Sequence, residues 1–244
     1  MQVDALAIRL RPRTPYEAAD LGARLCQSAW RDVYRCYAIV ALPVFGLCIA
    51  SSEFSTWLPT LAIWWLKPWL DRTILFVLSR AAFGQRTSLS DLWRAQRQVW
   101  WSQFLLTLTW RRLSPWRSFT QPVYQLEGLS FGQIRRRVRQ IRGSRSGSAF
   151  FVTSAYSSAE LALSLAIFSL LYWFAPLGQA PDLLQFFMGE DSTLRTLLFA
   201  VAYAAVPLFL EPFFVASGFG MYLSRRAELE AWDIEQELRR AFAE

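Results

Sequence analysis

Five charged side chains interrupt otherwise apolar stretches of this chain, and their types could do chemistry inside a membrane. They are Lys67, Asp71, Arg72, Glu160 and Glu211. A charge in hydrocarbon is costly unless it is paired or reaches water, so ionisable residues at that depth mark ion, proton or substrate sites. The same residue types also form ion pairs that hold helices together. The sequence therefore predicts a charged intramembrane cluster and leaves both roles open.

Depth within the helices predicts which of these residues meet. Counted from the basic residues that border their apolar stretches, Lys67 and Glu211 are 13 and 14 residues in, about 20 Å of helix. Glu160 should lie at a neighbouring level, and Asp71 should share a helix face with Lys67. Lys67 and Glu211 each precede a proline, and matched interruptions of two helices point to a midplane site. We therefore expect Lys67 and Glu211 to meet near mid-membrane.

Four apolar stretches are long enough to carry these residues across about 30 Å of hydrocarbon. They run from about residue 36 to 52, 55 to 78, 149 to 174 and 194 to 222. The chain is 54% hydrophobic with 12 Trp, which is more apolar and aromatic than a soluble domain of 244 residues normally is. The sequence predicts an all-α polytopic integral membrane protein, with about four transmembrane helices plus interfacial and cytoplasmic amphipathic helices, folded as one membrane domain over residues 1–244.

The distribution of arginine predicts the orientation of these helices. Of the 26 basic residues, 23 fall in residues 1–35, 80–147 and 225–244. Because cytoplasmic loops retain Lys and Arg, both termini are predicted to be cytoplasmic, and residues 80–147 to form a cytoplasmic or interfacial loop. The same asymmetry accounts for the sequence pI of about 9.8, so we expect lipid and protein partners and no nucleic acid.

One apolar segment, residues 98–110, does not fit four crossings. It is uncharged for 13 residues and flanked by arginine on both sides. Thirteen helical residues rise only about 20 Å, and a crossing here would leave the arginines of residues 111–145 outside. We expect the segment to be interfacial or re-entrant, with a fifth crossing as the alternative.

Two amphipathic helices are predicted at the ends of the chain. The first, residues 14–35, begins at Thr14-Pro15-Tyr16-Glu17, a capping pattern, and should lie at the membrane interface. The second, residues 224–243, is the most acidic stretch of the chain and should be cytoplasmic. Because it emerges on the same side as the basic helix, one interpretation is that the two pair within one molecule, and the other is a charged face exposed to solvent.

A basic amphipathic helix is predicted within the loop, over residues 131–142, because apolar residues recur there at helical spacing. Its other positions carry Arg135, Arg136, Arg137, Arg139 and Arg142. One interpretation is an anchor on anionic lipid headgroups, to which each arginine contributes on the order of 1 kcal/mol. The other is a docking site for an acidic protein partner.

Enzymatic function is not predicted, and we expect no catalytic residue, metal or cofactor. The chain has no His, which excludes His general bases and His-ligated metals. Its three Cys, expected to be reduced, lack paired metal-ligand spacing, and no nucleotide-binding loop is present. The glycines at 218 and 220 instead indicate close helix packing.

Several stretches resemble a family of uncharacterised proteobacterial inner-membrane proteins. They are residues 10–19 (LRPRTPYEAA), 65–72 (WLKPWLDR), 112–115 (RLSP), 211–219 (EPFFVASGF) and 229–235 (LEAWDIE). Such proteins are typically encoded beside a transglutaminase-like membrane protein and a group that includes a MoxR-type AAA ATPase. The resemblance implies a scaffold or assembly subunit of an envelope-associated complex in the bacterial inner membrane. The charged cluster supports an alternative, a small transporter or channel.

Overall fold

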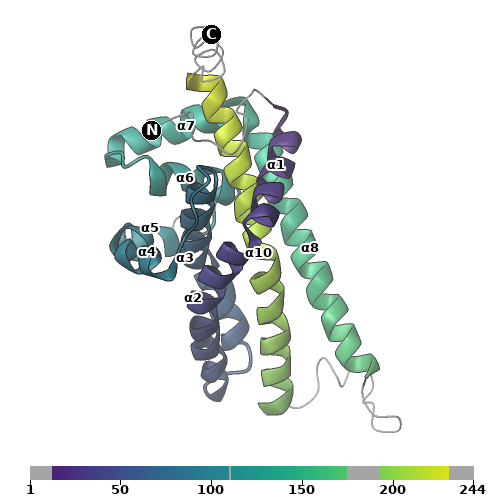
Figure 1. Cartoon of the computed structure of the whole chain (residues 1–244). Coiled ribbons are helices and arrows are strands. Elements are labelled where there is room, and N and C mark those ends of the chain that lie inside the picture. The colour runs from purple at the N-terminus through teal and green to yellow at the C-terminus, as the bar shows by residue number, and fades with distance from the viewer. Residues whose placement is uncertain (1–12, 110, 175–192, 231–244) are drawn as a thin grey trace.

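Helices make up almost all of the described structure. The computed structural model describes residues 13–109, 111–174 and 193–230, which contain no strand, so the all-α prediction is confirmed for them. The helices are α1 (Pro15–Ser28), α2 (Trp30–Ala50), α3 (Leu58–Ala81), α4 (Leu89–Arg94), α5 (Phe104–Leu108), α6 (Arg117–Leu126), α7 (Phe131–Arg142), α8 (Ser146–Trp173) and α10 (Thr193–Glu230) (Figure 1). Short turns η2 (Ser51–Glu53), η3 (Arg97–Trp101) and η4 (Gly143–Arg145) lie between them.

The longest helix, α10, is the axis of the bundle. It packs against α1, α3, α6 and α8, while α2 and α3 form an antiparallel hairpin through η2 (Figure 1). The basic helix α7 has the predicted bounds and leads through η4 directly into α8. Segments from both halves of the sequence therefore meet on α10.

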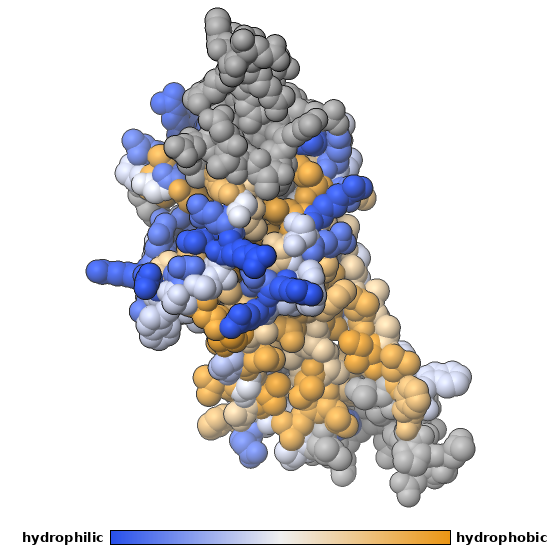
Figure 2. Space-filling view, in the orientation of Figure 1, coloured by the Kyte–Doolittle hydropathy of each residue, from blue (hydrophilic) through white to orange (hydrophobic). Residues whose placement is uncertain are grey.

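Within the residues that the structure describes, three segments are long and apolar enough to cross a membrane. They are Trp30–Glu53, Gly132–Leu170 and Arg195–Glu230. Large apolar side chains remain exposed along them, and Figure 2 shows such side chains covering the lower half of the molecule while polar ones gather above. Examples are Leu42, Leu47, Leu161, Leu165, Val201 and Phe209. Such a belt is costly in water and favourable in lipid, as expected of a membrane protein. The fourth predicted crossing, α3, is not among the three segments and carries three charges in its middle.

Two helix crossings depend on glycine. In α10, Gly220 faces the backbone of α1, so that a Cβ at Gly220 would collide with the Ala18 carbonyl oxygen. Gly22 of α1 is held equally close to the backbone of Ala216. Gly218 meets the backbone of α6 in the same way. The predicted close packing at these glycines is confirmed, and it joins both α1 and α6 to α10.

The terminal helices differ from prediction in their extent. The cap at Thr14 is confirmed, since its hydroxyl accepts a hydrogen bond from the Glu17 amide. The predicted helix over 14–35 is wrong, because the chain bends at Ala29 and α2 begins at Trp30. The separate helix predicted to begin at 224 is also wrong, because α10 continues unbroken to Glu230. No helix-breaking residue lies between its apolar and charged parts, and residues 231–243 lie outside the described structure.

The apolar segment 98–110 is broken rather than continuous. A π turn, η3, ends at Trp101, and Gln103 adopts a left-handed backbone conformation with φ of 58° before α5 begins. Both pieces have five residues, far fewer than a crossing needs. They pack along α3, where the Trp69 indole donates a hydrogen bond to the Trp100 carbonyl. No single helix therefore runs through the described residues of this segment.

The glycine contacts predict a selective loss of stability. Gly220→Ala should destabilise the protein by about 1 to 3 kcal/mol, because the added methyl forces two helix backbones apart. Gly46→Ala is the matched control, since a Cβ at Gly46 in α2 meets nothing within 4 Å. Thermal melts of the purified protein in detergent should show a lower Tm for the first variant only. Equal melting temperatures would contradict the close packing of α1 on α10.

Candidate functional site: a buried charge cluster and a basic groove

One lysine lies at the centre of the charged cluster. Lys67 Nζ from α3 is 2.6 Å from Glu160 Oε2 of α8 and 3.1 Å from Glu211 Oε2 of α10. Lys67 is 4% exposed and Glu211 is 3% exposed. The prediction that Lys67 and Glu211 meet, with Glu160 at their level, is confirmed. Tyr203 of α10 completes this part by donating a hydrogen bond to Glu160 Oε1 at 3.0 Å.

A second cation in the cluster, Arg117, was not predicted. Its Nη2 donates to Glu211 Oε1 at 2.5 Å, and its Nε is 3.3 Å from Asp71 Oδ2. Arg117 is the first residue of α6, and the contact at Gly218 holds α6 against α10. The indole of Trp116, the preceding residue, donates a hydrogen bond to the Ser146 carbonyl. Counting the charges in the apolar stretches would have indicated that a cation was missing. Three buried carboxylates facing one lysine require another cation.

Arg72 does not belong to the cluster, contrary to prediction. It follows Asp71 by one residue, a turn of about 100° around the helix, and so faces the other side of α3. Its guanidinium donates to the carbonyls of Val99 and Gln98 and to the Thr107 hydroxyl at 3.3 Å. Arg72 thereby fastens the broken segment η3–α5 to α3.

The prolines that follow Lys67 and Glu211 do not interrupt their helices. Pro68 lies inside α3 and Pro212 inside α10, and both helices continue through them. The expectation that the prolines interrupt the two helices is therefore wrong. The charges meet because side chains from continuous helices converge, not because backbone groups are freed.

A cavity of about 280 Å³ reaches the charged cluster. Lys67, Glu160 and Glu211 line it together with Arg112, Arg117, Trp64 and hydroxyl-bearing residues of α8. Arg112 stacks on Trp64, with its guanidinium carbon 3.7 Å from the ring centroid. Ion pairing and an accessible space are thus both present at the cluster.

The basic helix borders a larger groove of about 800 Å³. Arg111, Arg135, Arg139 and Arg142 line it over an apolar floor of Leu106, Ile134 and Val138. Two of its arginines are held by aromatic rings, Arg111 over Tyr124 and Arg142 over Trp116. The groove combines positive charge with apolar surface, which suits an acidic amphipathic ligand.

The other two predicted arginines have different surroundings. Arg137 forms ion pairs with Glu127 and Glu230, which ties α7 to α6 and α10. A parallel ion pair joins Arg145 to Glu228. Of the two interpretations of the acidic end of the chain, these ion pairs favour pairing with the basic segment at Glu228 and Glu230. Arg136 is exposed and does not line the groove.

The cysteines and acidic residues form no metal site in the described part of the chain, where no group of three or more potential ligands gathers. Cys26, Cys36 and Cys48 are free and buried. Burial raises the pKa of the Cys26 thiol in α1 to about 12, which keeps it in the unreactive thiol form. None of the family models, curated proteins or solved structures compared with the chain matches it.

The ion-pair geometry predicts which second change rescues the loss of Lys67. Lys67→Met should destabilise the protein by roughly 3 to 5 kcal/mol, because it leaves buried carboxylates unpaired. Adding Glu160→Gln should restore most of that loss, since Glu160 has no other cation within ion-pair distance among the described residues. Adding Glu211→Gln should restore less, because Glu211 keeps Arg117 and Glu160 stays unpaired. Thermal melts of the single and double variants provide the measurement. Additive losses in both doubles would contradict the pairing.

Proposed function

We propose that the chain is a four-crossing protein of the bacterial inner membrane with both termini in the cytoplasm. The three apolar segments support three crossings, and α3 is the fourth. Its 24 residues are long enough to span. Lys67 and Asp71 form ion pairs within the protein and Arg72 donates to backbone carbonyls, while the Asp71 oxygens make no hydrogen bond among the described residues. A helix whose charged side chains face protein partners crosses a membrane in spite of its low hydropathy.

The position of α3 can be tested by thiol labelling. Single cysteines at Glu53 and Gln85, exposed positions beyond the two ends of α3, are introduced into a chain lacking the native cysteines. Cysteine at Glu53 should react with an impermeant maleimide added outside intact spheroplasts, because the turn η2 is predicted to face out. Cysteine at Gln85 or at Ser144 should react only after lysis. Labelling of both Glu53 and Gln85 positions from outside would contradict a crossing by α3.

We propose that this protein acts as a scaffold or assembly subunit whose basic groove docks an acidic segment of a partner. The observation that carries the proposal is the groove itself, with four arginines over an apolar floor. Its ion-paired surroundings support a rigid docking surface, because α7 is tied to α6 and α10 by Arg137. Pre-organisation of this kind lowers the entropic cost of binding. The family resemblance adds the transglutaminase-like protein and the AAA ATPase as candidate partners.

Two neighbouring arginines separate partner docking from lipid anchoring. Arg139→Glu and Arg136→Glu make the same charge change at exposed positions of α7, but only Arg139 lines the groove. A candidate partner co-expressed with the protein should co-purify with wild type and Arg136→Glu, and at least 10-fold less with Arg139→Glu, as loss of a charged contact predicts. Equal loss in both variants would show instead that α7 responds to the charge of the membrane surface.

A small transporter or channel is the second candidate, favoured by the cavity at Lys67, Glu160 and Glu211. The rescued double variant at Lys67 and Glu160 distinguishes the two functions in a deletion strain. Restored folding together with restored complementation supports a structural role for the ion pair. Restored folding without complementation supports transport, because the charges themselves then carry the activity.

A further inference from the structure

Arg112 is a buried cation that forms no ion pair within 4.0 Å among the described residues. It is 9% exposed, and its Nε has no hydrogen-bond acceptor among the described residues. None of the ion pairs formed by the neighbouring cluster includes it, since Lys67 and Arg117 take the three carboxylates. Its guanidinium lies against the face of Trp64, and Glu211 and Asp71 act on it only as charges at longer range. A guanidinium in such a position is a ready-made acceptor for a phosphate or carboxylate.

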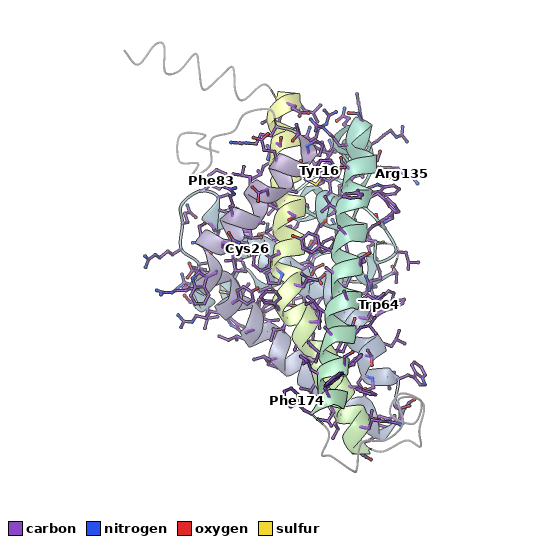
Figure 3. The ribbon with its side chains drawn as sticks, turned by 90° about the vertical axis from the view of Figure 1, so that its right-hand side faces the viewer. Tyr16, Cys26, Trp64, Phe83, Arg135 and Phe174 are labelled. Carbon is purple, nitrogen blue, oxygen red and sulfur yellow. The ribbon has the colours of Figure 1, made fainter. Side chains whose placement is uncertain are left out.

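The cavity that Arg112 lines opens on the side of the bundle. Its rim includes Trp64, which is 38% exposed, and the exposed residues Leu113 and Ser157. Trp64 lies part-way along the molecule, between Arg135 near one end and Phe174 near the other (Figure 3). Ser157 is about 16 Å along α8 from its first residue. The mouth therefore lies among exposed apolar side chains, close to Leu161 of α8. In the proposed four-crossing arrangement, on which this inference rests, the phase beside it is lipid.

The chemistry of the wall restricts the ligand further. The carboxylates of Glu160 and Glu211 are held by Lys67 and Arg117, so Arg112 is the charged group of the lining that remains available. At about 280 Å³, the cavity is near the lower limit of small-molecule sites, enough for a headgroup but not for acyl chains. Acyl chains attached to such a headgroup would lie outside, against the exposed apolar surface.

We propose that the cavity between α3 and α8 binds the phosphate of a phospholipid, which enters from the bilayer and is held by Arg112. This inference goes beyond the scaffold function and does not depend on the basic groove. A failure of partner docking at the groove would not contradict phosphate binding at Arg112, and a failure of phosphate binding would not contradict docking at the groove.

The test uses the full-length protein, depleted of lipid in an uncharged detergent, with phosphatidylglycerol as the probe. Wild-type protein should gain thermal stability saturably and show one bound lipid by native mass spectrometry. Diacylglycerol with the same chains should give no saturable shift. Arg112→Gln should raise the apparent Kd on the order of 10- to 100-fold, the effect of losing a charged hydrogen bond. Arg94→Gln, the same change at an exposed arginine outside every cavity described above, should leave it unchanged.

A blocking experiment keeps the inference testable if Arg112→Gln does not fold. Ser157→Cys labelled with a bulky maleimide should abolish the lipid effect by closing the mouth, while labelled Ser158→Cys, an exposed neighbour outside the lining, should not. Lipid binding that is unchanged by Arg112→Gln or by the Ser157 block would overturn the proposal, as would equal loss with Arg94→Gln. Saturation by inorganic phosphate alone, dependent on Arg112, would support the phosphate site with a soluble anion as its source.

Discussion

The requirement that buried charge be neutralised determines how this chain folds. Lys67 brings one positive charge to a site where three helices place three carboxylates. In a low-dielectric interior an unpaired carboxylate costs several kcal/mol, which no apolar packing nearby offsets. A second cation must therefore enter the bundle, and Arg117 is supplied by the long connection between α3 and α8. This requirement explains why α6 packs into the bundle instead of resting on its surface.

The close helix contacts follow from that insertion. For Arg117 to reach Glu211, the first turn of α6 must touch the backbone of α10, and only a residue without a Cβ at Gly218 permits this. Two residues farther along, Gly220 lets α1 approach another face of α10. The small residues in α10 are thus as necessary to the cluster as its charges. Farther along α10, ion pairs to Glu228 and Glu230 hold the basic connection at its other end.

The contact between Lys67 and Glu211 could be predicted from the sequence, because it depends only on their depth along the two helices. Counting residues from a basic border placed Lys67 and Glu211 at one level, because helical rise is constant. Arg117 could not be assigned to the cluster, because a position in a predicted loop says nothing about the depth of its side chain in the membrane. Arg72 was misassigned because the count gives height but not the direction around the helix. The continuity of α10 was missed because a change from apolar to charged composition resembles a helix boundary, although nothing there breaks the helix.

Two consecutive arginines connect the two sites of this protein. Arg111 stacks on Tyr124 and lines the basic groove, while Arg112 stacks on Trp64 and lines the lateral cavity. Arg117, five residues after Arg112, forms ion pairs with Asp71 and Glu211 of the cluster. These ion pairs hold the segment that carries Arg111 and Arg112 at its C-terminal end. The cluster holds its three carboxylates with two cations, Lys67 and Arg117. Arg112 beside it forms no ion pair within 4.0 Å among the described residues. The cluster therefore joins the helices of the bundle, and Arg111 and Arg112 place one cation in each of the two hollows beside it.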